Sequence, residues 1–187
     1  MQINIETRPP ASAAYDIKKK RLVETIDRLY LRDAKASLQK MISRIHPADM
    51  AAILDDLPPA HVVDVFYAIA DTTMAADVFN QLPSGLRSQV MTESPVEKLA
   101  AVLEHLPPDD LADLIGDLPE AQREQLMALL GRESKNEVES LLQYDPSSAG
   151  GIMTTDFFSL PHTLTVEEAI ESIRSREDVE MVFYLYL

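Results

Sequence analysis

The 187-residue chain contains no cysteine and only five glycines. The absence of cysteine excludes disulfides, thiolate metal sites and cysteine nucleophiles, and it is compatible with a reducing cytosol. No apolar run approaches the ~20 residues that cross a bilayer, so the chain is not expected to span a membrane by itself. No signal peptide is expected either, because the basic run at 18–21 is not followed by an apolar segment. At 46% apolar residues, the chain can nevertheless build a folded core.

Sequence patterns that mark common enzyme sites are also missing. The chain has no GxSxG, no P-loop and no GxGxxG, and the Gly150-Gly151 pair alone is too weak to indicate phosphate binding. The spacing of the four histidines does not match a metal site (His46, His61, His105 and His162). No residue therefore supports an enzymatic function.

Basic residues are scarce in the middle of the chain. Residues 1–47 carry ten Lys or Arg against five acids, whereas residues 48–120 carry fourteen acids against only Arg87 and Lys98. The acidic middle repels nucleic acid and anionic lipid headgroups, so no nucleic-acid partner is expected. It would attract cations or a basic partner, although a merely solubilising acidic surface is the alternative explanation.

A Leu-Pro pair recurs along the chain and divides it into short units. The first three pairs are spaced by 25 and 24 residues and the fourth follows after 12; all five pairs begin at Leu57, Leu82, Leu106, Leu118 and Leu160. Within each unit apolar residues fall at i, i+3, i+4 and i+7, which is the helical period. Because proline favours the start of a helix and pushes the preceding residue out of helical conformation, each pair is expected to end one helix and begin the next. The sequence therefore predicts a small α-solenoid of paired short helices.

The expected helices span about ten residues each and are too short to be stable alone. Their predicted ranges are 16–32, 35–45, 47–56, 58–70, 72–81, 84–92, 95–105, 108–116, 119–130 and 133–143. A capping box is expected at Ser94 to Glu97, before the seventh helix.

The pattern changes at the joint Ala149-Gly150-Gly151-Ile152-Met153-Thr154, where two of the five glycines are adjacent. Residues 157–160 are expected to be extended, Thr165 to Glu168 to form a capping box that begins a helix through about residue 176, and residues 181–187 to form a buried strand. A lone strand, helix and strand cannot bury both faces of a sheet. We therefore expect the sequence to be a piece of a longer protein.

Three segments together resemble the MgtE family of magnesium transporters: "HPADMAAILDDLPP", "LPPDDLADLIGDLPE" and "DPSSAGGIMTTDFFSLPHTLTVEEAIESIRSR". The resemblance covers roughly residues 35–187. It implies a mainly α fold, a right-handed superhelix of short helices like the family's N domain, followed by a partial α/β CBS segment. The implied domains are a basic arm or helix at 1–34, the helical superhelix at 35–143, and a linker with the start of the first CBS domain at 144–187.

The resemblance also implies a function. In that family, a cytosolic part at the inner membrane binds Mg²⁺ between acids of the N domain and acids of the CBS domains, and this holds a homodimer compact and its pore closed. The expected ligand is therefore regulatory Mg²⁺ of low affinity, and the expected partners are the CBS domains and the pore of the same protein. Contact with a membrane is expected only through that pore domain. CBS modules also bind adenine nucleotides, but such sites usually need residues beyond position 187.

Four residues are candidate metal ligands because of this resemblance. Asp77 occupies a position where the family has an acid, and Asp109 and Asp113 are four apart, so both project from one helix face. The alternative is that Asp109 and Asp110 merely favour the positive N-terminal end of their helix. Gly151 is expected to bring a backbone carbonyl near an ion, or simply to permit a turn. Weaker candidates are Asp55, Asp56, Asp110 and Asp117, for which a solvated face is the alternative.

Two other functions remain open at this point. The helical part also resembles modules of the flagellar motor-switch protein, which act as protein-interaction scaffolds. The chain is alternatively the regulatory part of a soluble CBS protein without transport activity.

Overall fold

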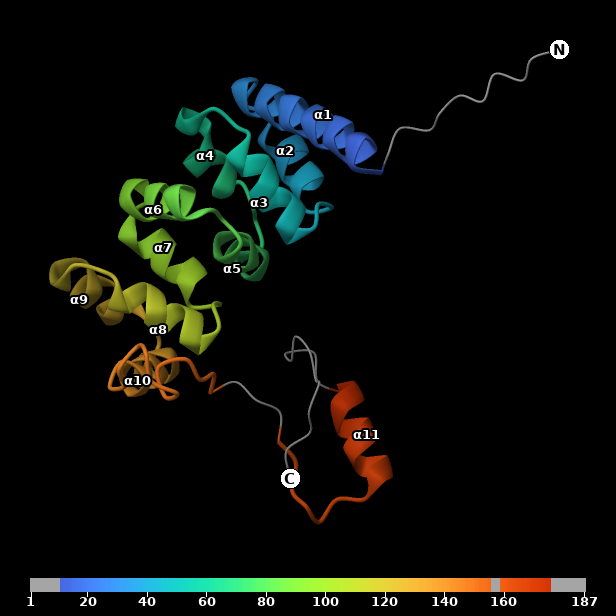
Figure 1. Cartoon of the computed structure of the whole chain (residues 1–187). Coiled ribbons are helices and arrows are strands. Elements are labelled where there is room, and N and C mark those ends of the chain that lie inside the picture. The colour runs from blue at the N-terminus through green and yellow to red at the C-terminus, as the bar shows by residue number, and fades with distance from the viewer. Residues whose placement is uncertain (1–10, 156–158, 176–187) are drawn as a thin grey trace. The chain divides into compact units, whose positions relative to one another are not determined.

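The computed structural model describes residues 11–155 and 159–175, and in these residues it contains eleven helices and no strand (Figure 1). The helices are α1 (Ala11–Leu31), α2 (Lys35–Ile42), α3 (Pro47–Asp55), α4 (Pro59–Phe66), α5 (Thr72–Asn80), α6 (Ser84–Glu93), α7 (Val96–Leu103), α8 (Pro108–Gly116), α9 (Glu120–Leu129), α10 (Arg132–Leu141) and α11 (Val166–Ser175). The predicted mainly α fold of short helices is confirmed. The largest differences from the predicted ranges are that α1 begins at Ala11 rather than 16, and α4 ends at Phe66 rather than 70.

The first four Leu-Pro pairs separate helices as predicted, whereas Leu160-Pro161 lies in a non-helical segment before α11. The two residues of a pair have different roles. Leu57, Leu82 and Leu106 are buried between consecutive helices. The proline that follows each leucine is the N-cap of the next helix, with no side-chain cap, as at Pro58, Pro83 and Pro107. Pro95 and Pro119 are N-caps in the same way. The leucine therefore anchors the junction in the core while the proline starts the helix.

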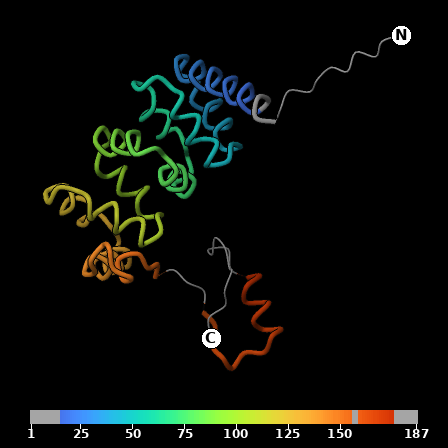
Figure 2. The backbone as a smooth tube through the Cα atoms, in the orientation of Figure 1, coloured from blue at the N-terminus to red at the C-terminus, as the bar shows by residue number. Residues whose placement is uncertain are grey.

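The helices of one compact unit, residues 1–106 and 118–132, stack in sequence order. Contacts join α3 to α5, α5 to α7 and α7 to α9, so these helices form one row; α4 contacts α6 in a second row (Figure 2). At one end of the unit α1 packs on α2, α3 and α4. Contact between each helix and the helix two positions later is the arrangement expected of a solenoid.

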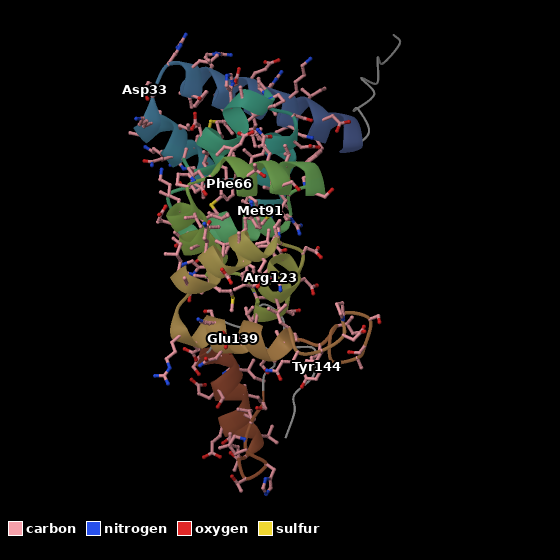
Figure 3. All side chains as sticks on the ribbon, turned by 90° about the vertical axis from the view of Figure 1, so that its left-hand side faces the viewer. Asp33, Phe66, Met91, Arg123, Glu139 and Tyr144 are labelled. Carbon is pink, nitrogen blue, oxygen red and sulfur yellow. The ribbon has the colours of Figure 1, made fainter. Side chains whose placement is uncertain are left out.

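Two arginines complete helix ends in this unit, and the sequence pattern did not reveal them. The Arg87 guanidinium donates to the carbonyls of Asn80 (2.8 Å) and Leu82 (3.3 Å), and Arg123 donates to Leu118 (3.3 Å). Each arginine follows the proline of a Leu-Pro pair by four residues. Arg123 and the buried Phe66 are labelled in Figure 3. Both arginines satisfy carbonyls that the end of the preceding helix leaves without a helical donor.

A second compact unit comprises residues 107–117 and 133–187 and holds α8, α10 and α11. The predicted capping box before α11 is confirmed: the Thr165 N–H donates to Glu168 Oε2 (2.8 Å), and the Glu168 N–H donates to Thr165 Oγ1 (3.3 Å). The hydrogen bond from the Thr165 backbone, together with that from its hydroxyl, lowers the pKa of Glu168. No described helix is both long enough and apolar enough to cross a membrane.

The capping box predicted at Ser94 is wrong. Ser94 is the C-cap of α6 in extended conformation, and its N–H donates to the Val90 carbonyl. Pro95 takes the N-cap position of α7, without a side-chain cap. The proline sets the helix start one residue later than the serine, so Glu97 has no reciprocal partner there.

Other predictions remain untested. The strand at 181–187 and residues 157–158 of the extended segment at 157–160 lie outside the described residues, so the partial CBS segment stays a prediction. The domain boundaries at 34/35 and 143/144 also stay predictions.

Candidate metal-binding residues

The carboxylates of Asp109 and Asp113 lie on α8. The N-cap of this helix is Pro107, and Pro108 is in its first turn. The apolar face of this helix is buried through Leu111, Ala112 and Ile115. Asp109 is half-buried and Asp113 is exposed, so both remain in reach of water. The four-residue spacing of two acids on one helix raises their mutual repulsion. In the described residues, neither makes an ion pair with a basic side chain.

The joint brings a hydroxyl to one of these carboxylates. Thr154 Oγ1 donates a hydrogen bond to Asp109 Oδ1 (3.3 Å), although the two residues are 45 apart in sequence. Sequence reasoning did not select Thr154. It lies in the Ala149–Thr154 joint motif, but no spacing rule connects it to α8.

The segment before Thr154 is a hydrogen-bonded turn. Asp145 Oδ1 accepts from the Ser147 N–H (2.8 Å) and hydroxyl (2.5 Å), and the Asp145 carbonyl accepts from the Ser148 N–H (2.9 Å). The bond from the Ser147 hydroxyl, with that from its N–H, lowers the pKa of Asp145. The Gly151 N–H closes the turn on the Ser148 carbonyl (3.1 Å). The turn therefore holds the chain between α10 and Thr154 in a defined shape.

Gly151 is required here by space. A Cβ at this position would lie 2.8 Å from Pro146 Cα and would overlap the Asp145 carbonyl oxygen. Its φ is not positive, so the left-handed backbone region is not the reason for a glycine. The structure agrees with a turn role for Gly151.

Asp77 lies on α5, in the first unit. Its side chain is half-buried between Ala76 and Val78, which are both buried. Burial, followed by the negative charge of Asp71, raises the pKa of Asp77 above its ordinary value of 3.8. Asp71 itself caps α5 by accepting from the N–H groups of Thr73 (3.0 Å) and Met74 (3.3 Å). The Asp77 carboxylate is thus held where its negative charge is unfavourable.

The described residues contain no group of three or more acids or histidines close enough to hold one metal ion. In the second unit the Thr154 hydroxyl bonds to Asp109, and Asp113 follows Asp109 by four residues on α8. These side chains offer only oxygen atoms. Oxygen is the ligand atom that Mg²⁺ prefers, and Mg²⁺ commonly keeps several waters while binding one or two carboxylates. The arrangement therefore resembles part of a site rather than a complete cage.

Substitution of Gly151 by alanine should loosen the joint turn. The added Cβ must displace the backbone of Asp145 or Pro146, and the N–H of Ile152 should lose its bond to the Ser148 carbonyl (3.2 Å). Amide hydrogen exchange at Ser148, at position 151 and at Ile152 should accelerate about tenfold or more, because these bonds then open more easily. Gly85→Ala is the matched control, because its Cβ meets nothing within 4 Å on helix α6. Unchanged exchange in Gly151→Ala would contradict the steric requirement.

Replacement of Asp77 by asparagine should stabilise the fold at neutral pH. Because the folded-state pKa lies above the unfolded one, the charged carboxylate costs stability above that pKa, and the cost disappears as the pH falls through it. The gain should stay below about 1 kcal/mol, because water screens a partly exposed carboxylate. Urea unfolding at pH 7 and at pH 3 measures the difference, with Asp55→Asn as control. A loss of stability at pH 7 would show that the charged form is favoured.

Residues 45–147, more than half of the chain, match the family model described as the MgtE intracellular N domain. A protein of Thermus thermophilus named "Magnesium transporter MgtE" is 30% identical over 175 residues, which are 91% of this chain and 38% of that protein. A Bacillus subtilis protein of the same name is 27% identical over 163 residues, 85% of this chain and 36% of that protein. The chain therefore spans less than two fifths of the length of these relatives.

Two solved structures share the fold. "Crystal structure of the soluble part of a magnesium transporter" superposes with a TM-score of 0.79 at 20% identity, over 90% of this chain and 66% of that one. "Crystal structure of the cytosolic domain of the Mg2+ channel MgtE in complex with ATP" gives a TM-score of 0.73 at 29% identity, over 87% and 67%. The first shows the fold alone. Together with the family match over residues 45–147, these findings show that the chain belongs to the MgtE family and carries its intracellular N domain.

Proposed function

We propose that this chain is the magnesium-responsive regulatory part of a magnesium transporter, on the cytosolic side of the inner membrane. Mg²⁺ binds at low affinity to the oxygens of Asp109 and Asp113, and it acts as a regulatory ligand that gates a pore elsewhere in the same protein. The observation that carries the proposal is the pair of carboxylates on one face of α8, without an ion-pair partner among the described basic residues.

The charge of the domain supports an ion-linked response. Residues 48–120 hold fourteen acids and two bases, so carboxylates without nearby cations repel one another. A divalent cation that binds one arrangement better than another shifts the population toward it, by as much as its affinities differ. Low affinity at each site is compatible with this role, because the ion must leave when its concentration falls.

In this proposal, the ligands that complete the site at Asp109 and Asp113 come from parts of the protein outside α8. Asp77 and the Gly151 carbonyl contribute at separate positions, with acids of the predicted CBS domains as their partners. The protein is a homodimer, and this chain has no enzymatic role, in line with curated relatives that are named as transporters. One structural neighbour is in complex with ATP, so nucleotide binding by a longer form of the protein is part of the same proposal.

Mn²⁺ tests the site on this chain alone, because it takes similar oxygen ligands and broadens nearby amide resonances. At submillimolar Mn²⁺, amides of α8 and of residues 151–155 should broaden first, and millimolar Mg²⁺ should reverse the effect. The double variant Asp109→Asn/Asp113→Asn should lose this selective broadening.

The matched control is Asp55→Asn/Asp56→Asn, which removes the same charge from the C-terminal end of α3 and should leave the broadening at α8 intact. Potassium at equal ionic strength controls for general screening. Broadening that follows acidic residues uniformly, or that survives in Asp109→Asn/Asp113→Asn, would exclude a site on α8.

Regulation requires the longer protein. In a polypeptide that extends this chain through both predicted CBS domains, millimolar Mg²⁺ should protect the segment after residue 143 from proteolysis, and Asp109→Asn/Asp113→Asn should remove the protection. A protein that binds Mn²⁺ at α8 but shows no magnesium-dependent protection would keep the metal site and refute the gating role.

A further inference from the structure

One face of the first unit is basic although the chain as a whole carries a net charge of −14. We define the basic face by the exposed Lys and Arg residues of α1 and the following α2 segment that form no ion pair in the described structure: Lys18, Lys20, Arg21, Arg28, Arg32, Lys40 and Arg44. Two other lysines of this region are occupied, since Lys19 pairs with Asp56 (2.9 Å) and Lys35 with Asp33 (3.5 Å). The notable feature is that these cations remain open to solvent beside an acidic domain.

The position of α1 keeps this face open. The helix packs against α2, α3 and α4 through the side that holds the buried Ile26. Side-chain bonds fix it there: the Tyr15 hydroxyl donates to Asp49 (2.7 Å), and the Tyr30 hydroxyl donates to Asp64 (2.6 Å). In Figure 1, no other described helix of this unit covers the side of α1 that faces away from α2, α3 and α4.

Exposed aliphatic side chains lie in the same row as the arginines. Ile17, Arg21, Glu24, Arg28 and Leu31 follow the spacing i, i+4, i+7, i+11 and i+14, so they share one stripe of α1. Ile17 is 51% exposed and Leu31 is 66% exposed. The stripe thus has an apolar residue near each end, two arginines between them and a single acid. A soluble anion would make no favourable contact with the aliphatic side chains of Ile17 and Leu31.

A cleft of about 580 Å³ continues the basic face between α1 and α2. Its charged lining includes Lys18, Lys40 and Arg44, and its apolar lining includes Leu22 and Ile45. Asp49 is the one acid in the lining, and its carboxylate already accepts the Tyr15 hydroxyl. Three cations above an apolar floor suit a phosphate group attached to a hydrocarbon body.

We propose that the basic face docks on an anionic phospholipid bilayer, with lipid phosphates at the arginines and in the cleft, and with Ile17 and Leu31 at the depth of the headgroups. Clusters of four to eight Lys or Arg on an amphipathic helix are typical of binding to anionic lipids. A bilayer is favoured over nucleic acid because the exposed aliphatic residues can insert among lipid headgroups, whereas they would make no favourable contact with nucleic acid. The basic face shares no residue with the proposed metal site on α8.

Vesicle sedimentation in magnesium-free buffer tests the proposal on the whole chain. Vesicles of phosphatidylglycerol and phosphatidylcholine in equal parts should pellet the protein, and vesicles of phosphatidylcholine alone should not. Each basic residue near an anionic surface contributes roughly fivefold to binding, so Arg21→Glu/Arg28→Glu should reduce partitioning by about 25-fold or more. Binding should weaken as salt shortens the screening length to about 8 Å at physiological ionic strength.

Two further variants separate the contributions. Arg132→Glu/Lys135→Glu makes the same charge change on α10 and should leave partitioning unchanged. Ile17→Ser/Leu31→Ser keeps the charge and should reduce partitioning severalfold with the same salt dependence. All six side chains lie on helices, so circular dichroism should be used to check that each variant keeps its helices.

Three results would overturn the proposal. The first is equal binding to neutral and anionic vesicles, or binding to neither. The second is displacement from the vesicles by millimolar inorganic phosphate with no effect of Ile17→Ser/Leu31→Ser, which would assign the cleft to a soluble anion. The third is self-association that Arg21→Glu/Arg28→Glu abolishes, measured by light scattering without lipid, which would make an acidic surface of a second copy the occupant.

Discussion

The structure depends on the mutual burial of helices that are too short to persist alone. Apart from α1, every described helix has only eight to ten residues, below the ~12–15 residues at which an isolated helix becomes even marginally stable in water. Stacking supplies the missing stability, because the buried side chains are all apolar, with Phe66 and Phe79 among the largest. The buried Leu57, Leu82 and Leu106, each followed by a proline, belong to the same core, so the residue that ends a helix also holds it to its neighbours.

The same constraint explains why so much of the fold is predictable from the sequence. The Leu-Pro pairs and the helical period act locally, and they place ten helices almost where the structure has them. The local rule at Ser94 failed because Pro95 competes for the same cap position. Three interactions could not be predicted from the sequence, because each depends on how a turn folds back on a neighbouring element. They are the caps from Arg87 and Arg123 and the bond from Thr154 to Asp109.

A core without buried charged or polar residues in the described part of the chain leaves most charges at the surface, although the guanidinium groups of Arg87 and Arg123 are partly buried. The acids on α8 and the bases on α1 are therefore free to serve separate purposes without disturbing the stack. Cation binding at one surface and anion binding at another can thus coexist in a chain whose net charge is −14.

The joint that first distinguishes the two parts of the sequence is a stiff connection in the structure. Four hydrogen bonds of the Asp145–Gly151 turn, and the lack of room for a side chain at Gly151, fix the path that leads to Thr154. A carboxylate has about four lone-pair positions, so Asp109 can accept the Thr154 hydroxyl and still bind a cation. In the proposed mechanism, a change in charge at Asp109 is therefore felt directly at Thr154. Because hydrogen bonds fix the turn that precedes Thr154, we expect a displacement of Thr154 to move the residues that follow it rather than to distort the turn.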